Sequence, residues 1–397
     1  MVRCQKDTRY EESIAYILER SDAFGAIPSA FATGSAGRYA QKALPMVTQQ
    51  NALEFCLGAF ELWSTQDRHY SSIVRGMQVT YGLICTLRNF ASQTELDAPV
   101  GELAPRLEEM RVLLARPLFA RIPEGDVGSW TFRILRLDQI FRLLEKESIA
   151  RLLQLVYEID ALVSLAEVTR KYDFVLPDIE EGPLRVRAEG LAHPLVSDAI
   201  ANPVDLNQNH RMLFLTGPNM AGKTTYLRAC ATAVYLAHLG MGVPARRFHF
   251  VPARWLFSSI SLSDELRGGI SYFRAEALRV KAVAQALADG GSVISIMDEP
   301  FKGTNVLDAL DAARAIMERF AARADCLFIF SSHLIELNEQ LAHNDRIDCR
   351  YFKADESEGH LRFDYVLRSG VSSQRLGMRV LREEGVPEPL DANADDV

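Results

Sequence analysis

The stretch that decides the fold is MLFLTGPNMAGKT, residues 212–224. Its first four residues are apolar, and they run directly into the pattern GxxxxGK[ST], which opens a helical stretch at 223–239. A strand before this pattern and a helix after it are the context in which such a loop binds phosphate. Glycines let backbone N–H groups approach the phosphate, and the helix N-terminus adds its positive dipole end. The sequence therefore predicts a site for the phosphates of a nucleotide.

Two side chains of this segment carry specific roles. Lys223 is expected to reach the β- and γ-phosphates of ATP, and the Thr224 hydroxyl is expected to bind Mg²⁺. A chance glycine-rich turn beside a lysine would lack the strand and the helix on its two sides. The nucleotide-binding residues predicted from this segment are Gly217, Pro218, Asn219, Met220, Ala221, Gly222, Lys223, Thr224 and Thr225.

The regions around this loop alternate between two patterns. Short apolar runs rich in β-branched and aromatic residues, at 212–216, 292–297 and 326–331, alternate with helical stretches at 223–239, 273–288 and 306–323. That order predicts an α/β domain with a largely parallel central sheet. A later alternation of apolar and polar residues over 361–367 predicts a half-buried strand.

The first 170 or so residues show helical periodicity instead. The clearest case is 149–168, where apolar residues recur at intervals of three and four and so share one helix face. Similar stretches lie at 9–20, 51–63, 71–87 and 100–114. We therefore expect an all-helical domain over 1–176, an α/β domain over 177–387 and an acidic, disordered tail over 388–397.

Two acidic residues follow the apolar run at 292–297. Asp298 is expected to hold Mg²⁺, and Glu299 to polarise the water that attacks the nucleotide. Alone, such a pair is more often a solvated turn, but its coupling to the phosphate loop favours catalysis. His333 follows the run at 326–331, and although a lone histidine there is usually structural, we expect it to sense the γ-phosphate. The predicted catalytic residues are therefore Glu299, His333 and Lys223, and the predicted metal ligands are Thr224 and Asp298.

Composition bounds the class of protein. The 397 residues are 48% hydrophobic and 24% charged, which is typical of a soluble globular protein and excludes a disordered or collagen-like chain. The net charge of -8 gives no overall attraction for nucleic acid, so any DNA contact needs a local patch or a partner. The N-terminus is polar, the six cysteines lie far apart, and the longest uncharged apolar stretch, 229–243, is short for a bilayer span. We expect a cytoplasmic protein with no membrane association.

Longer segments carry a family resemblance. TGPNMAGKTTYLR (216–228), MDEPFKGTNVLDA (297–309) and SSHLIELNE (331–339) resemble the MutS DNA mismatch-repair family of ABC-type ATPases. YEIDALVSLAEV (157–168) and SGVSSQRLGMRVLREEGVP (369–387) extend the resemblance, which covers residues 150–387. It implies a helical core/lever domain followed by an ABC-type P-loop ATPase domain. It also implies Mg²⁺-dependent hydrolysis of ATP at composite sites of a homodimer, which switches conformation in DNA repair.

The resemblance also implies roles for single residues. Ser271 lies in a segment that looks like the family's signature loop, and its counterpart points at the γ-phosphate bound by the opposite protomer. Asn219 matches a position beside the γ-phosphate, and Tyr365 falls where the family has an aromatic ring that stacks on adenine. For Tyr365, packing in the core of its expected strand is an equal alternative. Residues 302–305 and Asp308 match a loop that lies across the dimer seam.

Departures from the family pattern leave alternatives open. No Phe-x-Glu mismatch wedge occurs, the stretch before residue 149 is short for the family's DNA clamp, and Ala199 replaces an aromatic residue of the adenine pocket. DNA binding is therefore expected to be weak or partner-assisted. One alternative is a MutS-derived ATPase that acts through a protein partner outside mismatch repair, without intrinsic mismatch recognition. A second is a DNA-binding module that uses local arginines, and a third is an ABC ATPase of another class, although the Leu-Ser-Gly-Gly-Gln signature of transporters is absent.

Overall fold

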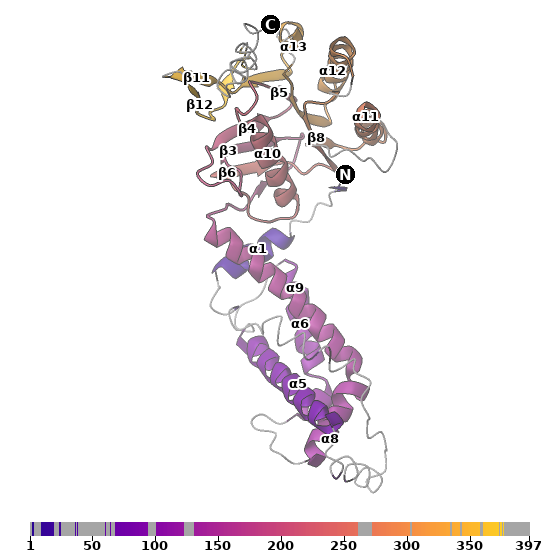
Figure 1. Cartoon of the computed structure of the whole chain (residues 1–397). Helices are drawn as coiled ribbons and strands as arrows, with labels where there is room; N and C mark the ends of the chain where they lie inside the picture. The colour runs from indigo at the N-terminus through magenta and orange to yellow at the C-terminus, as the bar shows by residue number, and fades with distance from the viewer. Residues whose placement is uncertain are drawn as a thin grey trace, which may run out of the picture. The chain divides into compact units, whose positions relative to one another are not determined.

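The computed structural model describes most of the chain in two compact units. The described residues are 2–3, 9–19, 68–93, 101–122, 131–260, 272–301, 304–333, 336–341, 344–357 and 360–372, with the single positions 24, 36, 38, 60, 64, 374 and 376. One unit comprises Thr8–Arg170, and the other comprises Lys171–Val397 with Met1–Asp7. We call them the helical unit and the α/β unit, and each is described by itself (Figure 1).

The helical unit confirms the helical periodicity of the sequence. Its helices are α1 (Arg9–Glu19), α5 (Arg68–Gln93), α6 (Leu103–Leu114), α7 (Pro117–Ala120), α8 (Thr131–Gln139), the π-helical turn η1 (Ile140–Leu144) and α9 (Lys146–Lys171). The predicted apolar face of 149–168 lies on α9, where Leu152, Val156 and Ile159 are buried. Nearly all of the helix expected over 51–63 lies outside the described residues.

Helices α6 and α9 are also joined by charged side chains. Arg106 Nε donates to Glu158 Oε2 at 2.8 Å, and Arg151 Nε donates to Glu109 Oε1 at 2.6 Å. The hydrogen bonds that the Arg151 guanidinium donates lower the pKa of the Glu109 carboxyl from its usual value. The pairs are partly exposed, so each contributes little stability, but together they fix how the two helices face each other.

The α/β unit is built on a seven-stranded sheet with the order β1-β7-β8-β9-β5-β10-β13. The five inner strands run parallel, whereas each edge strand pairs antiparallel with its neighbour. This confirms the largely parallel sheet. The strands are β1 (Val2–Arg3), β7 (Trp255–Ser259), β8 (Val293–Asp298), β9 (Cys326–Ser331), β5 (Met212–Thr216), β10 (Ile347–Tyr351) and β13 (Arg368–Ser369).

Both faces of this sheet are covered (Figure 1). Along β5, Leu213 and Leu215 pack into a core with helix α10 (Lys223–His238) and a second sheet, whereas Met212 and Phe214 pack on the opposite side with α11 (Tyr272–Ala288) and α12 (Val306–Ala321). A strand buried on both sides reads as continuous apolar sequence. The second sheet has the order β2-β6-β3-β4, with β2 (Asp178–Ile179), β6 (Arg247–Phe250), β3 (Val186–Leu191) and β4 (Asn202–Leu206).

The strand expected over 361–367 is wrong beyond its first half. Strands β11 (Ala354–Ser357) and β12 (His360–Phe363) form a hairpin, and β12 ends at Phe363. Tyr365 has a φ of 55°, in the left-handed region, so it lies in a turn and not on a strand. The alternation continues in the sequence, but the backbone after Phe363 is bonded to Asn202, as described below. Short helix α13 (Glu336–Leu341) completes the described elements.

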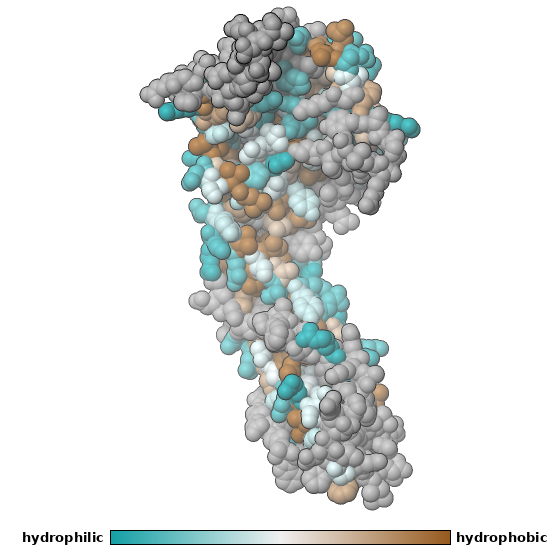
Figure 2. Space-filling model, viewed as in Figure 1, coloured by the Kyte–Doolittle hydropathy of each residue, from teal (hydrophilic) through white to brown (hydrophobic). Residues whose placement is uncertain are grey.

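Figure 2 shows hydrophilic and hydrophobic side chains intermingled over the described part of the face that it presents. Within the described helices, none combines the length and the apolar character that crossing a bilayer requires.

Candidate functional site

The loop at residues 217–222 joins β5 to α10 and needs glycine at both ends. Gly217 has a φ of 142°, and a Cβ there would lie 2.8 Å from the carbonyl oxygen of Phe352. Gly222 has a φ of 99° and forms the N-cap of α10. Both values lie in a region that side-chain-bearing residues rarely adopt, so the glycines fix the path of the loop.

Lys223 opens α10 and folds back over this loop. Its ammonium Nζ donates to the carbonyl oxygens of Gly217 at 2.8 Å and Pro218 at 3.1 Å, and the side chain is buried. A buried ammonium needs acceptors, because desolvation otherwise disfavours its charge. The loop carbonyls supply them, and the positive charge stands at the mouth of the loop, where an anion can reach it.

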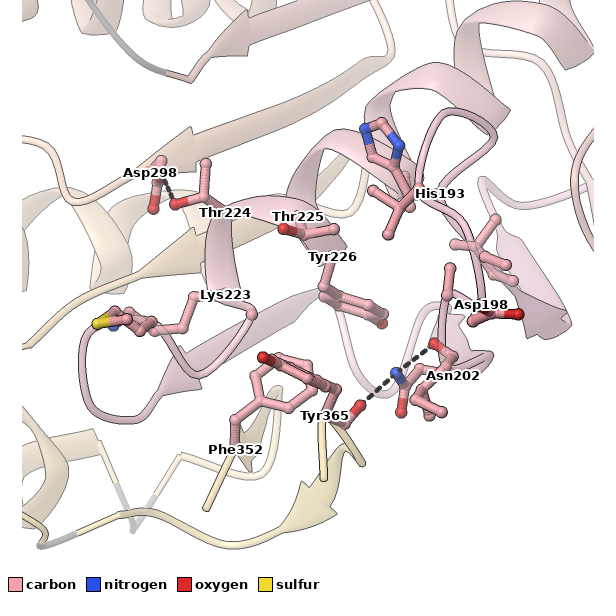
Figure 3. Close-up of a pocket in the computed structure, with 18 of the residues that line it drawn as sticks. His193, Asp198, Asn202, Lys223, Thr224, Thr225, Tyr226, Asp298, Phe352 and Tyr365 are labelled. Carbon is pink, nitrogen blue, oxygen red and sulfur yellow. Dashed lines mark hydrogen bonds between the residues drawn. The ribbon is translucent and has the colours of Figure 1, made fainter. Parts of the chain in front are cut away.

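Thr224 and Asp298 form a pair of oxygen donors (Figure 3). The Thr224 hydroxyl donates to Asp298 Oδ2 at 2.7 Å. Strand β9 separates β5 from β8, so the carboxyl ends of the three strands share one edge of the sheet. Carboxylate and hydroxyl oxygens are the hard ligands that Mg²⁺ takes, and Mg²⁺ is usually bound by one or two carboxylates together with phosphates and water. Across the described residues, no group of three or more His, Cys, Asp and Glu side chains competes as a metal site.

Glu299 brings the three predicted catalytic residues together. Its Oε1 lies 3.5 Å from Lys223 Nζ, and its Oε2 lies 3.5 Å from His333 Nδ1. The Glu299 side chain is only 10% exposed, whereas that of His333 is 55% exposed. Glu299 has a φ of 44°, a backbone conformation that is rare for residues other than glycine. A nearly buried carboxylate between two nitrogen groups is thus presented at the same edge as the Thr224–Asp298 pair.

Sequence reasoning gave no role to one residue at this edge, Ser331. Its hydroxyl donates to Asp298 Oδ1 at 2.5 Å and accepts from the Glu299 N–H at 3.1 Å. In the segment Ser331-Ser332-His333, the sequence pattern predicts a role for the histidine alone. The signal that could have identified Ser331 is that it lies at the end of one expected strand, as Asp298 lies at the end of another.

Lys223, Thr224, Asp298 and Glu299 line one cavity of about 620 Å³, within the size range of small-molecule sites. His333 and Ser331 do not line it. Of the predicted nucleotide-binding residues, Gly217 and Ala221 do not line it, and the Ala221 methyl group packs into the core. Ser271 lies outside the described residues. The predicted residues that do line the cavity are Pro218, Asn219, Met220, Gly222, Lys223, Thr224, Thr225, Asp298, Glu299 and Tyr365.

Asn202 holds the far end of this cavity together (Figure 3). Its Nδ2 donates to the carbonyl oxygens of Tyr365 at 2.9 Å and Ile200 at 3.1 Å, and its Oδ1 accepts from the Leu367 N–H at 2.7 Å. These bonds explain the turn at Tyr365. The Tyr365 ring is 44% exposed and stacks on Phe363 with centroids 6.1 Å apart, so it is neither fully buried nor free in solvent.

His193 adds a neutral ring to the same end of the cavity. Burial, reinforced by the nearby positive charge of Arg228, lowers the pKa of His193 from its usual value. Because that usual value is already below 7, the ring is uncharged at neutral pH. The cavity therefore carries Lys223, Asp298 and Glu299 at one end, and at the other the neutral ring of His193 together with Asp198 and Asn202 (Figure 3).

Comparison with known proteins finds both a family profile and individual relatives that this chain resembles. A sequence profile of MutS domain V matches residues 213–397. The chain is 32% identical over 255 residues to the DNA mismatch repair protein MutS of Natronomonas pharaonis. That stretch is 63% of this chain and 29% of the relative, so the chain covers less than a third of that protein's length.

Proposed function

This chain belongs to the MutS family, and we propose that it is a Mg²⁺-dependent ATPase that converts ATP to ADP and phosphate. The observation that carries the proposal is the charged end of the cavity. Lys223, the Thr224–Asp298 pair and Glu299 meet there within hydrogen-bond or ion-pair distance. An ammonium for phosphate, oxygen donors for Mg²⁺ and a carboxylate for water are the parts that phosphoryl transfer to water requires.

Each of these residues has a defined task in the proposal. Lys223 exchanges the carbonyl oxygens of its own loop for those of the β- and γ-phosphates. Thr224 and Asp298 would hold Mg²⁺, which when bound neutralises charge on the phosphates. Glu299 accepts the proton of the attacking water, and His333 orients Glu299 from its other side and contacts the γ-phosphate. The present Lys223–Glu299 contact keeps both charges compensated before the nucleotide arrives.

The remaining residues bind the nucleotide without taking part in proton transfer. Side chains or backbone of Pro218, Asn219, Met220, Gly222 and Thr225 surround the phosphates, and Gly217 and Ala221 contribute through the shape of the loop. We propose that Tyr365 packs on the adenine base, which fits its half-exposed ring in the lining of the cavity. Ser271 would complete the site of a second copy in an ATP-dependent homodimer.

We further propose a biological role in DNA repair, in the cytoplasm. It is supported by the MutS domain V match and by the relative's name. In this proposal the α/β unit is an ABC-type ATPase domain, the helical unit is the core/lever domain, and ATP turnover switches the conformation of the chain. DNA contact would be weak and salt-dependent, or assisted by a partner, because the chain carries a net charge of -8.

The test is steady-state ATP hydrolysis by the full chain, with and without perfect, mismatched and branched duplex DNA. Glu299→Gln should retain ATP binding and lower kcat about 100-fold or more, since the amide cannot accept the proton. Lys223→Ala should weaken ATP binding by about 100-fold, because it removes the charge that compensates the phosphates.

Glu318→Gln serves as the matched control, because Glu318 is exposed on α12 away from the cavity lining. It should hydrolyse ATP at the parental rate. Turnover by Glu299→Gln at that rate would show that another group activates the water, and an inactive parental chain would refute the ATPase.

A further inference from the structure

We propose that Ser331 is a positioning residue that holds the Asp298 carboxylate in the orientation needed for Mg²⁺ and fixes the backbone of Glu299. This inference rests on the proposed ATPase function and extends it to a residue outside the phosphate loop and the acidic pair. It concerns the end of the cavity that would hold Mg²⁺ and not the end that would hold the adenine ring.

The sheet places Ser331 between the two halves of the site. It ends β9, and its register partners are Leu215 on β5 and Asp298 on β8. Strand β5 leads into the 217–222 loop, and β8 leads into Glu299. The Ser331 side chain is fully buried, so its hydroxyl has the protein's own groups and not bulk water as partners. It is therefore placed to set the distance and orientation between the loop and the acidic pair.

The first contact of Ser331 orients the carboxylate without neutralising it. Asp298 accepts from Thr224 on one oxygen at 2.7 Å and from Ser331 on the other at 2.5 Å. Both donors are neutral hydroxyls, so the negative charge remains available to a cation. Thr224 is itself expected to bind Mg²⁺, whereas Ser331 lies behind the carboxylate on β9. Ser331 is thus the contact that can hold Asp298 whether or not the ion is bound.

The second contact fixes the residue that bears the proposed base. The Glu299 N–H is shared between the Ser331 hydroxyl and the Ser331 carbonyl oxygen, each at 3.1 Å. Glu299 has a φ of 44°, and residues in such sparsely populated conformations persist only where the surroundings determine them. Ser331 supplies that restraint. One hydroxyl therefore couples the metal ligand to the backbone from which the base projects.

The experiment compares three serine variants of the full chain: Ser331→Ala, Ser331→Thr and Ser295→Ala. Ser295 is the matched control, because it is a fully buried serine on β8 whose hydroxyl makes no hydrogen bond within the described part of the chain. Threonine keeps the hydroxyl and suits a strand. Two quantities are measured: the affinity for the fluorescent nucleotide mant-ATP as a function of Mg²⁺ concentration, starting in EDTA, and kcat and KM for ATP.

Ser331→Ala should bind mant-ATP in EDTA within about twofold of the parental chain, since Lys223 and the loop are intact. It should need about tenfold more Mg²⁺ to reach half of the Mg²⁺-dependent gain in affinity, the effect of losing one hydrogen bond to a charged group. Its kcat should fall about tenfold with KM within about twofold. Ser331→Thr should restore at least half of each effect, and Ser295→Ala should match the parental chain throughout.

Two results would overturn the inference. One is a parental Mg²⁺ requirement in Ser331→Ala, and the other is an equal loss in Ser295→Ala, which would indicate a general effect on the sheet. Failure of the proposed function looks different. A parental chain that binds Mg²⁺ and mant-ATP but never turns ATP over refutes the ATPase, and the Mg²⁺ titration of Ser331→Ala still decides the role of Ser331.

Discussion

Asp138 in the helical unit and Asp298 in the α/β unit both accept side-chain hydrogen bonds on each carboxylate oxygen, but from different donors. Arg142 Nε donates to Asp138 Oδ1 at 2.6 Å, and a second guanidinium nitrogen donates to Asp138 Oδ2. Asp298 accepts instead from the hydroxyls of Thr224 and Ser331. A guanidinium orients a carboxylate and cancels its charge, whereas a hydroxyl only orients it.

The difference distinguishes a carboxylate that stabilises the fold from one kept for a ligand. Asp138 and Arg142 are both 2% exposed, so their charges must compensate each other inside the helical unit. Glu145 follows the same rule, since Arg116 Nε donates to it at 2.8 Å. Asp298 is only partly buried at a cavity edge, where water can solvate its charge until a cation arrives. In the part of the chain that the structure describes, no ion pair compensates Asp298, and an oriented carboxylate of this kind is a candidate ligand for a cation.

Removing the cation of the Asp138–Arg142 pair should give the largest change in stability. Arg142→Met leaves Asp138 buried and charged, and we expect the free energy of unfolding to fall by about 3–5 kcal/mol. Urea unfolding of the full chain, followed by circular dichroism at 222 nm, measures it. Arg136→Met makes the same change at an exposed position of α8 and should cost less than about 0.5 kcal/mol.

The double variant Asp138→Leu/Arg142→Met should regain most of the stability lost by Arg142→Met, since no buried charge remains. Equal stability of Arg142→Met and the parental chain would mean that the pair is not structural, and the comparison with Asp298 would lose its basis.

Asp298→Asn tests the other side of the comparison. The amide still offers hydrogen-bonding groups to Thr224 and Ser331 but carries no charge, so stability should change by less than about 1 kcal/mol. The Mg²⁺-dependent gain in ATP affinity should fall about thirtyfold, or about 2 kcal/mol. Asp311→Asn on α12, whose side chain is 75% exposed, is the control and should leave that gain unchanged. If Asp298→Asn keeps its Mg²⁺ dependence, the charge at this position is not reserved for a cation.

The parts of the fold that the sequence predicts well are those written in contiguous residues. The apolar run at 212–216 is β5, and the helix after the loop begins at Lys223 as the pattern requires. The same holds for Asp298 at the end of β8, because an apolar run followed by two acidic residues is a local signal. These elements suffice to bring Lys223, Thr224, Asp298 and Glu299 to one edge once the sheet is parallel.

The parts that could not be predicted depend on which distant segments meet. The contact of Ser331 with Asp298 requires β9 to lie between β5 and β8, and strand order is not encoded in any single run of residues. The turn at Tyr365 depends on Asn202, which lies more than 150 residues earlier in the chain. The alternation over 361–367 predicts a strand, because it reports which face of a strand each side chain would occupy. It carries no information about hydrogen bonds from a residue distant in sequence.

Asn202 extends the comparison to a neutral side chain at the end of the cavity where we propose that adenine binds. Its side chain accepts from the Leu367 N–H at 2.7 Å and donates to the Tyr365 carbonyl oxygen at 2.9 Å. Asn202 therefore orients the segment that carries Tyr365, as Ser331 orients the Asp298 carboxylate. Asn202→Ala should release the turn that carries Tyr365 and weaken ATP binding about fivefold, or about 1 kcal/mol. kcat and the Mg²⁺ requirement should not change, since the charged end of the cavity is untouched.

The measurement that separates the two ends is competition of mant-ATP by ATP and by inorganic triphosphate, which lacks the base. Asn202→Ala should weaken ATP and leave triphosphate within about twofold of its parental affinity. Asn207→Ala is the matched control, because Asn207 also makes local hydrogen bonds, to Asp205 and His210, in an exposed turn that does not line the cavity. It should leave both competitors unchanged. Equal weakening of ATP and triphosphate by Asn202→Ala would show that Asn202 supports the phosphate end, and the base would then have to bind away from Tyr365.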